Sequence, residues 1–249
     1  MAKSFCVLPQ KAQLSKNMTS KSWIVLFARM SSSRLPGKTL LKLGSRSLLE
    51  ICCQRLQGND FNFIVATSDH ASDHSIQTEC ERLKIECFRG SLESPSQRLF
   101  SLIEEKSIEK VVRATADNIL PDHQLAKALE HVAKMYPKDC YSCVFGGNGM
   151  YPKGFALEYF STQFLEKQAK LGLIDDEHLT GLLRKKYVDR MPRISNISPS
   201  QYNFSIDTPE DYEQIKDIWE DELIVLSAVD LMNELAIRLE PNCHEKVEK

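Results

Sequence analysis

Long apolar runs are missing from this 249-residue sequence. Nowhere do the roughly eighteen apolar residues of a membrane-spanning helix follow one another, and the N-terminal stretch has no apolar segment of signal-peptide length. We therefore expect a cytoplasmic protein with no membrane partner. A surplus of charge is also missing, because the formal net charge is −2 and the pI is near 6.3. Nucleic acid is thus disfavoured as a partner, and any anion must be bound by local cations.

A complete zinc-binding cysteine pattern is absent as well. The chain contains eight cysteines, of which only Cys140 and Cys143 form a CxxC pair. A structural zinc site needs four ligands, and the second pair is not there. We expect Cys140 and Cys143 to lie on a strand as small apolar residues. Free thiols throughout are typical of a reducing compartment such as the cytosol.

Neither common glycine-rich phosphate motif is present. Of the pattern GxxxxGK[ST], the chain has only Gly37-Lys38-Thr39, and the first glycine of the pattern is absent. The run from Gly146 to Gly149 does not match GxGxxG and is typical of a hairpin loop. Any phosphate site in this protein must therefore be built in another way.

What the sequence does contain is a basic loop directly after a short apolar run. Residues 23–28 are apolar and predict a strand buried on both faces. Arg29, Arg34 and Lys38 follow, separated by small serine and glycine residues that let backbone N–H groups approach an anion. The spacing predicts a phosphate-binding loop, although a solvated basic loop would have the same composition.

Predicted strands and helices alternate along the rest of the chain. Strands are expected at 23–28, 62–66, 86–88, 110–114, 140–145, 155–160 and 203–206, and helices at 47–56, 73–83, 94–106, 123–135, 177–187, 208–219 and 222–239. This alternation predicts an α/β fold with a mostly parallel central sheet. We expect one domain over 21–240 with a substrate lobe at about 146–200, a disordered arm at 1–20 and a polar tail at 241–249. Met18 is a candidate start codon.

Short polar side chains follow three of the predicted strands. Thr67, Ser68 and Asp69 follow strand 62–66, Asp117 follows strand 110–114, and Asp207 follows strand 203–206. Open α/β sheets bind ligands beyond the carboxyl ends of their strands. Two carboxylates there would suit Mg²⁺, which takes one or two of them together with substrate phosphates. Turn formation and helix capping are the alternatives for these residue types.

A local basic cluster lies near the predicted helix 177–187. Its members are Arg184, Lys185, Lys186, Arg190 and Arg193. Such clusters are commonly solvated helix faces. Because the chain has no general cationic surplus, we interpret this one as a contact for an anionic substrate.

Six motifs in consistent order resemble the cytidylyltransferase family. They are ARMSSSRLPGK at 28–38, VATSD at 65–69, VVRATADNILPD at 111–122, GFALEYF at 154–160, EHLT at 177–180 and SIDTPEDY at 205–212. That family includes CMP-acylneuraminate synthetases, CMP-Kdo synthetases and a spore-coat polysaccharide branch, which this chain resembles most. The resemblance implies a three-layer fold of the nucleotide-diphospho-sugar transferase type with a small substrate and dimerisation lobe. It also implies CTP as nucleotide, Mg²⁺ as cofactor and a homodimer.

The same resemblance assigns roles to individual residues. The triphosphate loop would comprise Ala28, Arg29, Ser32, Arg34 and Lys38, and other nucleotide contacts would come from Thr67, Ser68, Asp69, Arg98 and Asp117. Asp117 and Asp207 would hold the metal, and the sugar would be contacted by Glu158, Glu177, His178 and Arg184. Catalysis would depend on Lys38, Arg29, Arg34, Asp117 and Asp207.

The expected reaction is attack of a sugar hydroxyl on the α-phosphorus of CTP, giving a CMP-sugar and pyrophosphate for surface polysaccharide or glycan synthesis. The basic cluster favours an acidic sugar. One alternative is a glycosyltransferase of similar fold, which would usually carry an Asp-x-Asp motif that Ala116-Asp117-Asn118 does not supply. Another is a catalytically silent nucleotide-binding protein. It is favoured by Ala116, where the family commonly has glycine, if the turn requires a positive φ.

Overall fold

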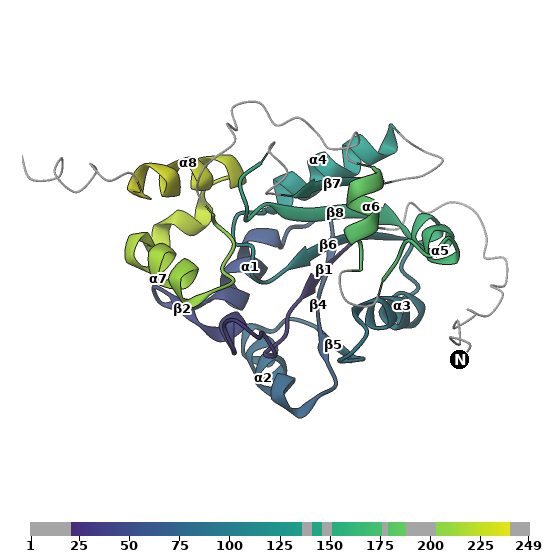
Figure 1. Cartoon of the computed structure of the whole chain (residues 1–249), viewed down its shortest axis with the longest axis horizontal. Helices are drawn as coiled ribbons and strands as arrows, with labels where there is room; N and C mark the ends of the chain where they lie inside the picture. Colours follow the sequence, from purple (N-terminus) through teal and green to yellow (C-terminus); the bar gives the residue numbers. More distant parts are fainter. Residues whose placement is uncertain (1–20, 136–140, 146–150, 176–178, 188–202, 240–249) are drawn as a thin grey trace, which may run out of the picture.

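The computed structural model describes residues 21–135, 141–145, 151–175, 179–187 and 203–239. Within them, one six-stranded sheet has the order β5-β4-β1-β6-β8-β7. Its strands are β1 (Trp23–Phe27), β4 (Asn62–Ser68), β5 (Cys87–Gly90), β6 (Lys110–Thr115), β7 (Tyr141–Phe145) and β8 (Ala156–Ser161). All neighbours pair in parallel except β8, which is antiparallel to β6 and to β7. The predicted α/β fold with a mostly parallel sheet is confirmed (Figure 1).

Helices connect the strands and pack around this sheet (Figure 1). They are α1 (Leu48–Leu56), α2 (His74–Leu83), α3 (Pro95–Lys106), α4 (His123–Lys134), α5 (Thr162–Lys170), α6 (Gly181–Lys186), α7 (Pro209–Ile218) and α8 (Ala228–Leu239). Short 3₁₀ helices occur at η1 (Lys38–Leu40), η2 (Ala71–Asp73) and η4 (Asp221–Val225), and β2 (Lys42–Leu43) pairs with β3 (Arg46–Ser47) as a separate hairpin. None of the described helices is long and apolar enough to cross a bilayer.

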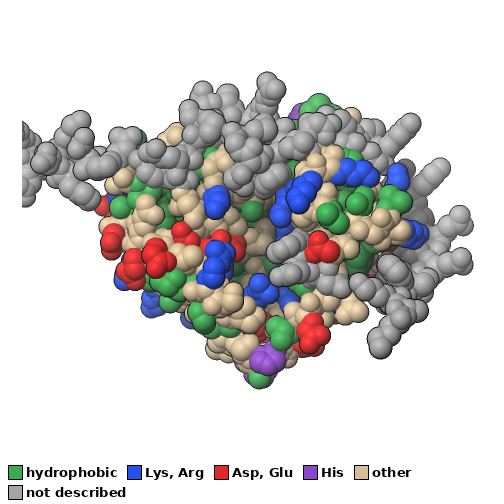
Figure 2. Space-filling view, viewed as in Figure 1, with side chains coloured by type: hydrophobic (Ala, Val, Ile, Leu, Met, Phe, Trp, Pro, Cys, Tyr) green, Lys and Arg blue, Asp and Glu red, His purple; other side chains and the backbone are tan. Residues whose placement is uncertain are grey.

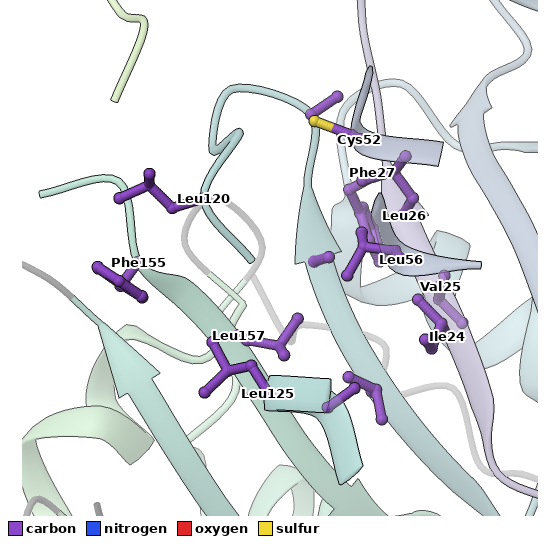
Figure 3. Close-up of a cluster of buried hydrophobic side chains, with 14 of the residues drawn as sticks. Ile24, Val25, Leu26, Phe27, Cys52, Leu56, Leu120, Leu125, Phe155 and Leu157 are labelled. Atoms are coloured by element: carbon purple, nitrogen blue, oxygen red, sulfur yellow. The ribbon is translucent and has the colours of Figure 1, made fainter. Parts of the chain in front are cut away.

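The core forms around β1. Ile24, Val25 and Leu26 are all fully buried, as expected for a strand with both neighbours parallel and both faces covered. Figure 3 shows these side chains beside Leu56 of α1, with Leu125 of α4 in the same apolar cluster. Since a buried aliphatic side chain contributes roughly 1.5–3 kcal/mol, the sheet is a stable support for the loops at its edge.

Helix capping agrees with the sequence at one helix and differs at another. Thr208 and Asp211 form a complete capping box at the start of α7, as their spacing predicts. The sequence also places Glu50 three residues after Ser47, the spacing of a capping box. Ser47 caps α1 by accepting from the Glu50 N–H, but the Glu50 carboxylate does not return a hydrogen bond to the Ser47 N–H. The Glu50 carboxylate instead pairs with Arg82 of α2. A tertiary ion pair therefore replaces the local contact.

The predicted elements differ from the structure in several places. Residues 203–206 form only isolated bridges, from Asn203 to Lys153 and from Ser205 to Asn118, because no neighbouring strand extends the pairing. The predicted helix 222–239 is divided into η4 and α8, since Leu226 is extended and Asp122 accepts a hydrogen bond from the Ala228 N–H at 2.8 Å. Of the helix predicted at 177–187, α6 forms the part from Gly181 to Lys186, Leu179 and Thr180 precede it, and residues 177–178 lie outside the described residues. Helix α5 was not predicted.

The proposed lobe is described only in part. Residues 1–20, 241–249 and much of 146–200 lie outside the described residues, as do Met18 and Cys140. Cys143, the other half of the CxxC pair, is a buried residue of β7, as predicted. Gly154 has φ 109°, and a Cβ added here would lie 2.8 Å from the carbonyl carbon of Phe204. This close contact joins the start of β8 to the segment that leads to Asp207.

Candidate functional site

Backbone pairing brings three distant segments to one edge of the sheet. β1 and β6 are neighbours in register, with Phe27 opposite Thr115, so the loops that follow them leave the sheet together. The Ala116 N–H donates to the Phe27 carbonyl at 3.0 Å. The Ile206 N–H donates to the Asp117 carbonyl, also at 3.0 Å. The basic loop and Asp117 therefore lie together at the carboxyl ends of the parallel strands β1 and β6, with Asp207 beside them.

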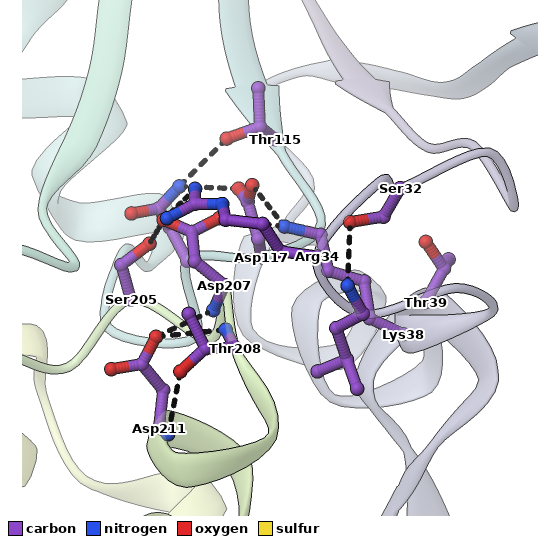
Figure 4. Close-up of polar contacts among 12 residues, drawn as sticks. Ser32, Arg34, Lys38, Thr39, Thr115, Asp117, Ser205, Asp207, Thr208 and Asp211 are labelled. Carbon is purple, nitrogen blue, oxygen red and sulfur yellow. Dashed lines mark hydrogen bonds and ion pairs between the residues drawn. The ribbon is translucent and has the colours of Figure 1, made fainter.

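The Lys38 ammonium contacts both aspartates (Figure 4). Its Nζ donates to Asp117 Oδ2 at 2.8 Å and to Asp207 Oδ1 at 2.9 Å. Burial lowers the pKa of Lys38, but the two carboxylates outweigh it and the pKa is raised overall. Burial raises the pKa of Asp207, but the hydrogen bond and charge of Lys38, together with the charge of Arg34, outweigh this effect. The pKa of Asp207 is therefore lowered overall. The three side chains form one charge cluster that carries a net negative charge.

The remaining carboxylate oxygens are held by neighbouring side chains. Asn118 Nδ2 donates to Asp117 Oδ1 at 2.6 Å and to Thr115 Oγ1 at 2.7 Å. Ser205 Oγ donates to Asp207 Oδ2 at 3.2 Å, and Arg34 lies 3.4 Å from the same oxygen. In each aspartate, one carboxylate oxygen thus accepts a hydrogen bond from Lys38, and the other accepts one from a neighbouring polar side chain.

Asn118 and Ser205 were not predicted as site residues. In the sequence, Asn118 directly follows Asp117 in the motif ADN, and Ser205 stands two positions before Asp207 in the motif SID. Asn118 and Ser205 pair with each other as an isolated antiparallel bridge, which brings both close to the two carboxylates. This pairing is a tertiary contact that sequence spacing does not show.

Ala116 fits its position without strain. The non-glycine residues with positive φ in the described chain are Lys84, Ser107 and Leu179, so Ala116 has a negative φ. Ala116 is 4% exposed, and Ile119 and Leu120 behind it are fully buried. The turn does not require glycine here, which removes the structural reason for expecting a catalytically silent protein.

The basic loop is closed on itself. The Met30 carbonyl accepts hydrogen bonds from the N–H groups of Ser32 and Gly37, each at 2.9 Å. Gly37 has φ 74°, a conformation that favours glycine. Ser32 Oγ accepts from the Leu35 N–H at 3.4 Å and so stabilises the turn. The loop is a compact, hydrogen-bonded turn, and its exposed side chains include Arg29 and Arg34.

Its cations differ in exposure. The Arg34 side chain is 64% exposed and that of Lys38 is 11% exposed. Arg29 is exposed, and Ala28 before it is buried. Arg29 and Arg34 are therefore accessible to an anion, whereas Lys38 is already engaged with the aspartates.

The VATSD motif is arranged differently from the prediction. Thr67 and Ser68 are fully buried, and both hydroxyls donate to Asp73 Oδ2. Of the three predicted nucleotide-contacting side chains in this motif, only Asp69 is exposed. Sequence reasoning placed Asp73 merely at the start of a helix and missed its role as the acceptor for this cluster.

Arg98 lies near β1 but is engaged by the protein. It is 2% exposed, and its Nε and Nη2 donate to the Ser91 carbonyl at 3.0 and 2.7 Å. Its guanidinium lies 5.9 Å from the centroid of the Phe27 ring, and that of Arg113 lies 5.2 Å from the same centroid. Arg113 was not predicted, although it stands in the motif VVRATADN.

Glu158 lies below the surface. It is 1% exposed, and its carboxylate accepts from Arg113 Nη1 at 2.8 Å, Thr180 Oγ1 at 2.6 Å and Tyr141 Oη at 3.2 Å. Arg184 Nη1 is 4.0 Å away. For Glu158 to contact a sugar, one of these donors would have to be displaced. The predicted contact between Glu158 and the sugar is not tested by the structure and stays a prediction. Glu177 and His178 lie outside the described residues.

The two aspartates suit a shared divalent cation. The Lys38 ammonium already lies within hydrogen-bond distance of both, so a single cation can contact the pair. Among the described residues no group of three or more His, Cys, Asp or Glu side chains could hold a metal. Mg²⁺ needs only one or two protein carboxylates when substrate phosphates complete its shell. The donor set fits Mg²⁺ that binds together with a phosphate.

The charges are unevenly distributed on this face. Figure 2 shows acidic side chains gathered toward its left and basic ones at its middle and right. The acidic side includes α7, with Glu210, Asp211, Glu213 and Asp217, and α6 contributes Arg184, Lys185 and Lys186. An anionic ligand would be attracted to the middle of this face and to α6.

Comparisons with known proteins agree on one family. Residues 23–235 match the family described as Cytidylyltransferase. The spore coat polysaccharide biosynthesis protein SpsF of Bacillus subtilis (strain 168) is 30% identical over 212 residues, which are 79% of this chain and 85% of that protein.

Solved structures share the fold. A cytidylyltransferase from Leptospira borgpetersenii superposes with a TM-score of 0.73 at 24% identity, over 89% of this chain and 95% of that one. A CMP:2-keto-3-deoxy-manno-octonic acid synthetase complexed with CTP superposes with a TM-score of 0.57 at 18% identity, over 80% and 98%.

Proposed function

This chain belongs to the cytidylyltransferase family, and on that premise we propose that it transfers CMP from CTP to a sugar hydroxyl with release of pyrophosphate. The observation that carries the proposal is the cluster of Lys38, Asp117 and Asp207 beside a closed basic loop. Such a cluster has both parts that nucleotidyl transfer needs, which are cations for the phosphates and carboxylates for a metal.

The reaction requires positioning and charge neutralisation more than covalent help. The sugar oxygen forms a bond to the α-phosphorus while the bond to the leaving pyrophosphate breaks in line. Arg29 and Arg34 are exposed on the loop and would bind the pyrophosphate as its charge develops. Lys38 would join them by turning from the aspartates to the phosphates.

Asp117 and Asp207 would hold Mg²⁺, which when bound would neutralise phosphate charge and polarise the α-phosphate. Asn118 and Ser205 keep their carboxylates oriented through the hydrogen bonds described above. The positions of the two carboxylates therefore do not depend on Lys38 alone. If Lys38 moves to the phosphates, both carboxylates keep a hydrogen bond that orients them.

The sugar is proposed to be acidic. The support is the group of Arg184, Lys185 and Lys186 on α6, beside the Glu158 network. The likeness to SpsF supports a product used for surface polysaccharide, and we further propose a cytoplasmic homodimer.

The proposal is tested by pyrophosphate release. Each of the four nucleoside triphosphates is assayed with a panel of acidic, neutral and phosphorylated sugars, with and without Mg²⁺. We expect turnover with CTP and an acidic sugar in the presence of Mg²⁺, and preference for CTP over UTP and ATP. Equal calorimetric binding of all four nucleotides would contradict the cytidine preference. Transfer of sugar from a finished nucleotide sugar, without pyrophosphate release, would indicate a glycosyltransferase instead.

A further inference from the structure

The peptide that joins Arg29 to Met30 is held at both of its polar atoms. Its carbonyl oxygen, which belongs to Arg29, accepts a hydrogen bond from Thr39 Oγ1 at 2.9 Å. Its N–H, which belongs to Met30, donates to Asp73 Oδ1 at 2.9 Å. Because a peptide unit is planar, holding both groups fixes its rotation about the chain. We refer to Thr39 and Asp73 as the peptide clamp.

The clamped peptide forms the neck of the basic loop. The next carbonyl, that of Met30, accepts the two hydrogen bonds from Ser32 and Gly37 that close the loop. Arg29 precedes the neck, Arg34 lies within the loop, and Lys38 directly follows Gly37. The rotation of this one peptide therefore sets the direction in which the loop and its cations leave the sheet.

Both clamp residues are set in the interior. Asp73 is 0% exposed and Thr39 is 2% exposed. The second oxygen of Asp73 accepts from Thr67 Oγ1 at 3.0 Å, from the Ser68 N–H at 3.0 Å and from Ser68 Oγ. One oxygen of the Asp73 carboxylate is thus fixed to the end of β4, and the other accepts the hydrogen bond from the Met30 N–H. A carboxylate acceptor also makes stronger hydrogen bonds than a neutral one.

We propose that Asp73 and Thr39 are positioning residues that preorganise the basic loop for the triphosphate of CTP. This inference rests on the proposed function. Neither side chain is exposed, so neither can touch the nucleotide, and both act through the Arg29–Met30 peptide. Donors that are already oriented stabilise developing phosphate charge without a reorganisation cost at the moment of reaction.

The variants separate positioning from general stability. Asp73→Asn keeps the volume, but its NH₂ group must face either the Met30 or the Ser68 N–H, so one backbone donor loses its acceptor. Thr39→Val removes the hydroxyl while keeping the shape, and Thr39→Ser restores the hydroxyl.

Thr162→Val is the matched control. Thr162 is also buried and donates to the Ile108 carbonyl at 2.6 Å. It follows Ser161, which pairs with Lys110 at the opposite end of the sheet. Thr162→Val should therefore lower stability without touching the loop.

The measurement is calorimetric binding of CTP and of inorganic triphosphate, with Mg²⁺ present, well below each variant's Tm. We expect CTP affinity to fall about 10- to 100-fold in Asp73→Asn and about 3- to 10-fold in Thr39→Val, by analogy with other losses of preorganised contacts. Thr39→Ser and Thr162→Val should bind as the wild type does. The double variant should lose less than the product of the two single losses, because both act on one peptide.

Several results would overturn the inference. Normal affinity in Asp73→Asn and Thr39→Val, or an equal loss in Thr162→Val, would reduce the clamp to a structural role. If Asp73→Asn does not fold, the comparison of Thr39→Val with Thr39→Ser decides. A wild type that binds triphosphate but not CTP would contradict the proposed nucleotide and leave the clamp to be judged on triphosphate. A wild type that binds neither would overturn both.

Discussion

Lys38 donates to Asp207 at 2.9 Å although 169 positions separate the two residues in the sequence. The same ammonium donates to Asp117 at 2.8 Å, so one cation holds together two carboxylates that would otherwise repel each other. Asp117 and Asp207 are also the proposed metal ligands. On that proposal, Lys38 and a divalent ion would compete for the same two carboxylates until nucleotide phosphates offer Lys38 another partner.

This competition predicts how Lys38→Met behaves. Loss of the ammonium should lower kcat/KM by about two to four powers of ten, as removal of a charge contact to the transition state does. Without nucleotide, Mg²⁺ should raise the Tm of Lys38→Met more than that of the wild type, because the carboxylates are then free. Differential scanning calorimetry measures the second effect. Lys216→Met, an exposed change on α7, is the control, and an equal Mg²⁺ response in wild type and Lys38→Met would refute the competition.

Asp117→Asn and Asp207→Asn should each raise the Mg²⁺ concentration for half-maximal turnover at least about tenfold. The double variant should be little worse than either single one, since each loss disables the same pair. Steady-state assays across a Mg²⁺ series provide the measurement. Asp217→Asn on α7 serves as a control for the loss of one negative charge. Fully additive losses would mean that the two aspartates do not share an ion.

The loss of unfolding free energy at acid pH should depend in part on Asp73. Burial raises its pKa, but hydrogen bonds from Ser68, Met30 and Thr67 outweigh this and hold the pKa below the ordinary value of 3.8. A carboxylate with a lowered folded pKa contributes stability above its unfolded pKa and loses it as pH falls through the folded value. The difference in unfolding free energy between wild type and Asp73→Asn should therefore be constant near neutral pH and shrink below pH 3.8.

Urea unfolding across pH measures that difference. Asp60→Asn, which removes an exposed ion pair with Lys127, should change the unfolding free energy little throughout, because exposed pairs contribute roughly 0–1 kcal/mol. The difference in unfolding free energy between wild type and Asp73→Asn could also stay constant until the protein unfolds in acid. That result would show that the hydrogen bonds to Asp73 do not depend on its charge.

Gly154→Ala should be strongly destabilising. A Cβ at this position would lie 2.7 Å from the Phe204 Cβ and 2.8 Å from its carbonyl carbon, at a φ of +109°. We expect a loss of about 3 kcal/mol or more, from the clash together with the strained backbone. Gly172→Ala is the matched control, since its φ is +69° but nothing lies within 4 Å of the added atom. Its loss should be about 1 kcal/mol. Similar losses in the two variants, measured by urea unfolding, would show that the contact with Phe204 can relax.

Glu158→Gln distinguishes a structural role from contact with the sugar. Because Arg113 is partnered by this buried carboxylate, loss of the charge should lower the unfolding free energy by roughly 3–5 kcal/mol. Arg184→Gln, at a more exposed position, should instead raise the KM for an acidic sugar with little change in stability. The comparison is made by thermal unfolding and steady-state kinetics. A stable Glu158→Gln with a raised sugar KM would place Glu158 in the sugar site instead.

Much of the fold and the site could be predicted because it depends on local spacing. Apolar periodicity defines β1, β4 and α4 in the sequence, and Thr208 with Asp211 marks the start of α7 without any tertiary information. The rule that ligands bind beyond the carboxyl ends of parallel strands selected Asp117, which follows β6. Asp207 was selected on a strand predicted at 203–206, which forms only isolated bridges, and on the family resemblance.

What only the tertiary structure decided is which partners those local elements meet. Side-chain spacing cannot show that Lys38 would contact both aspartates, that Thr67 and Ser68 would turn inward to Asp73, or that Asp122 would cap α8 as well as α4. These contacts join residues that only strand pairing and loop packing bring together, and a polar group buried by that packing must take whichever partner the fold places beside it.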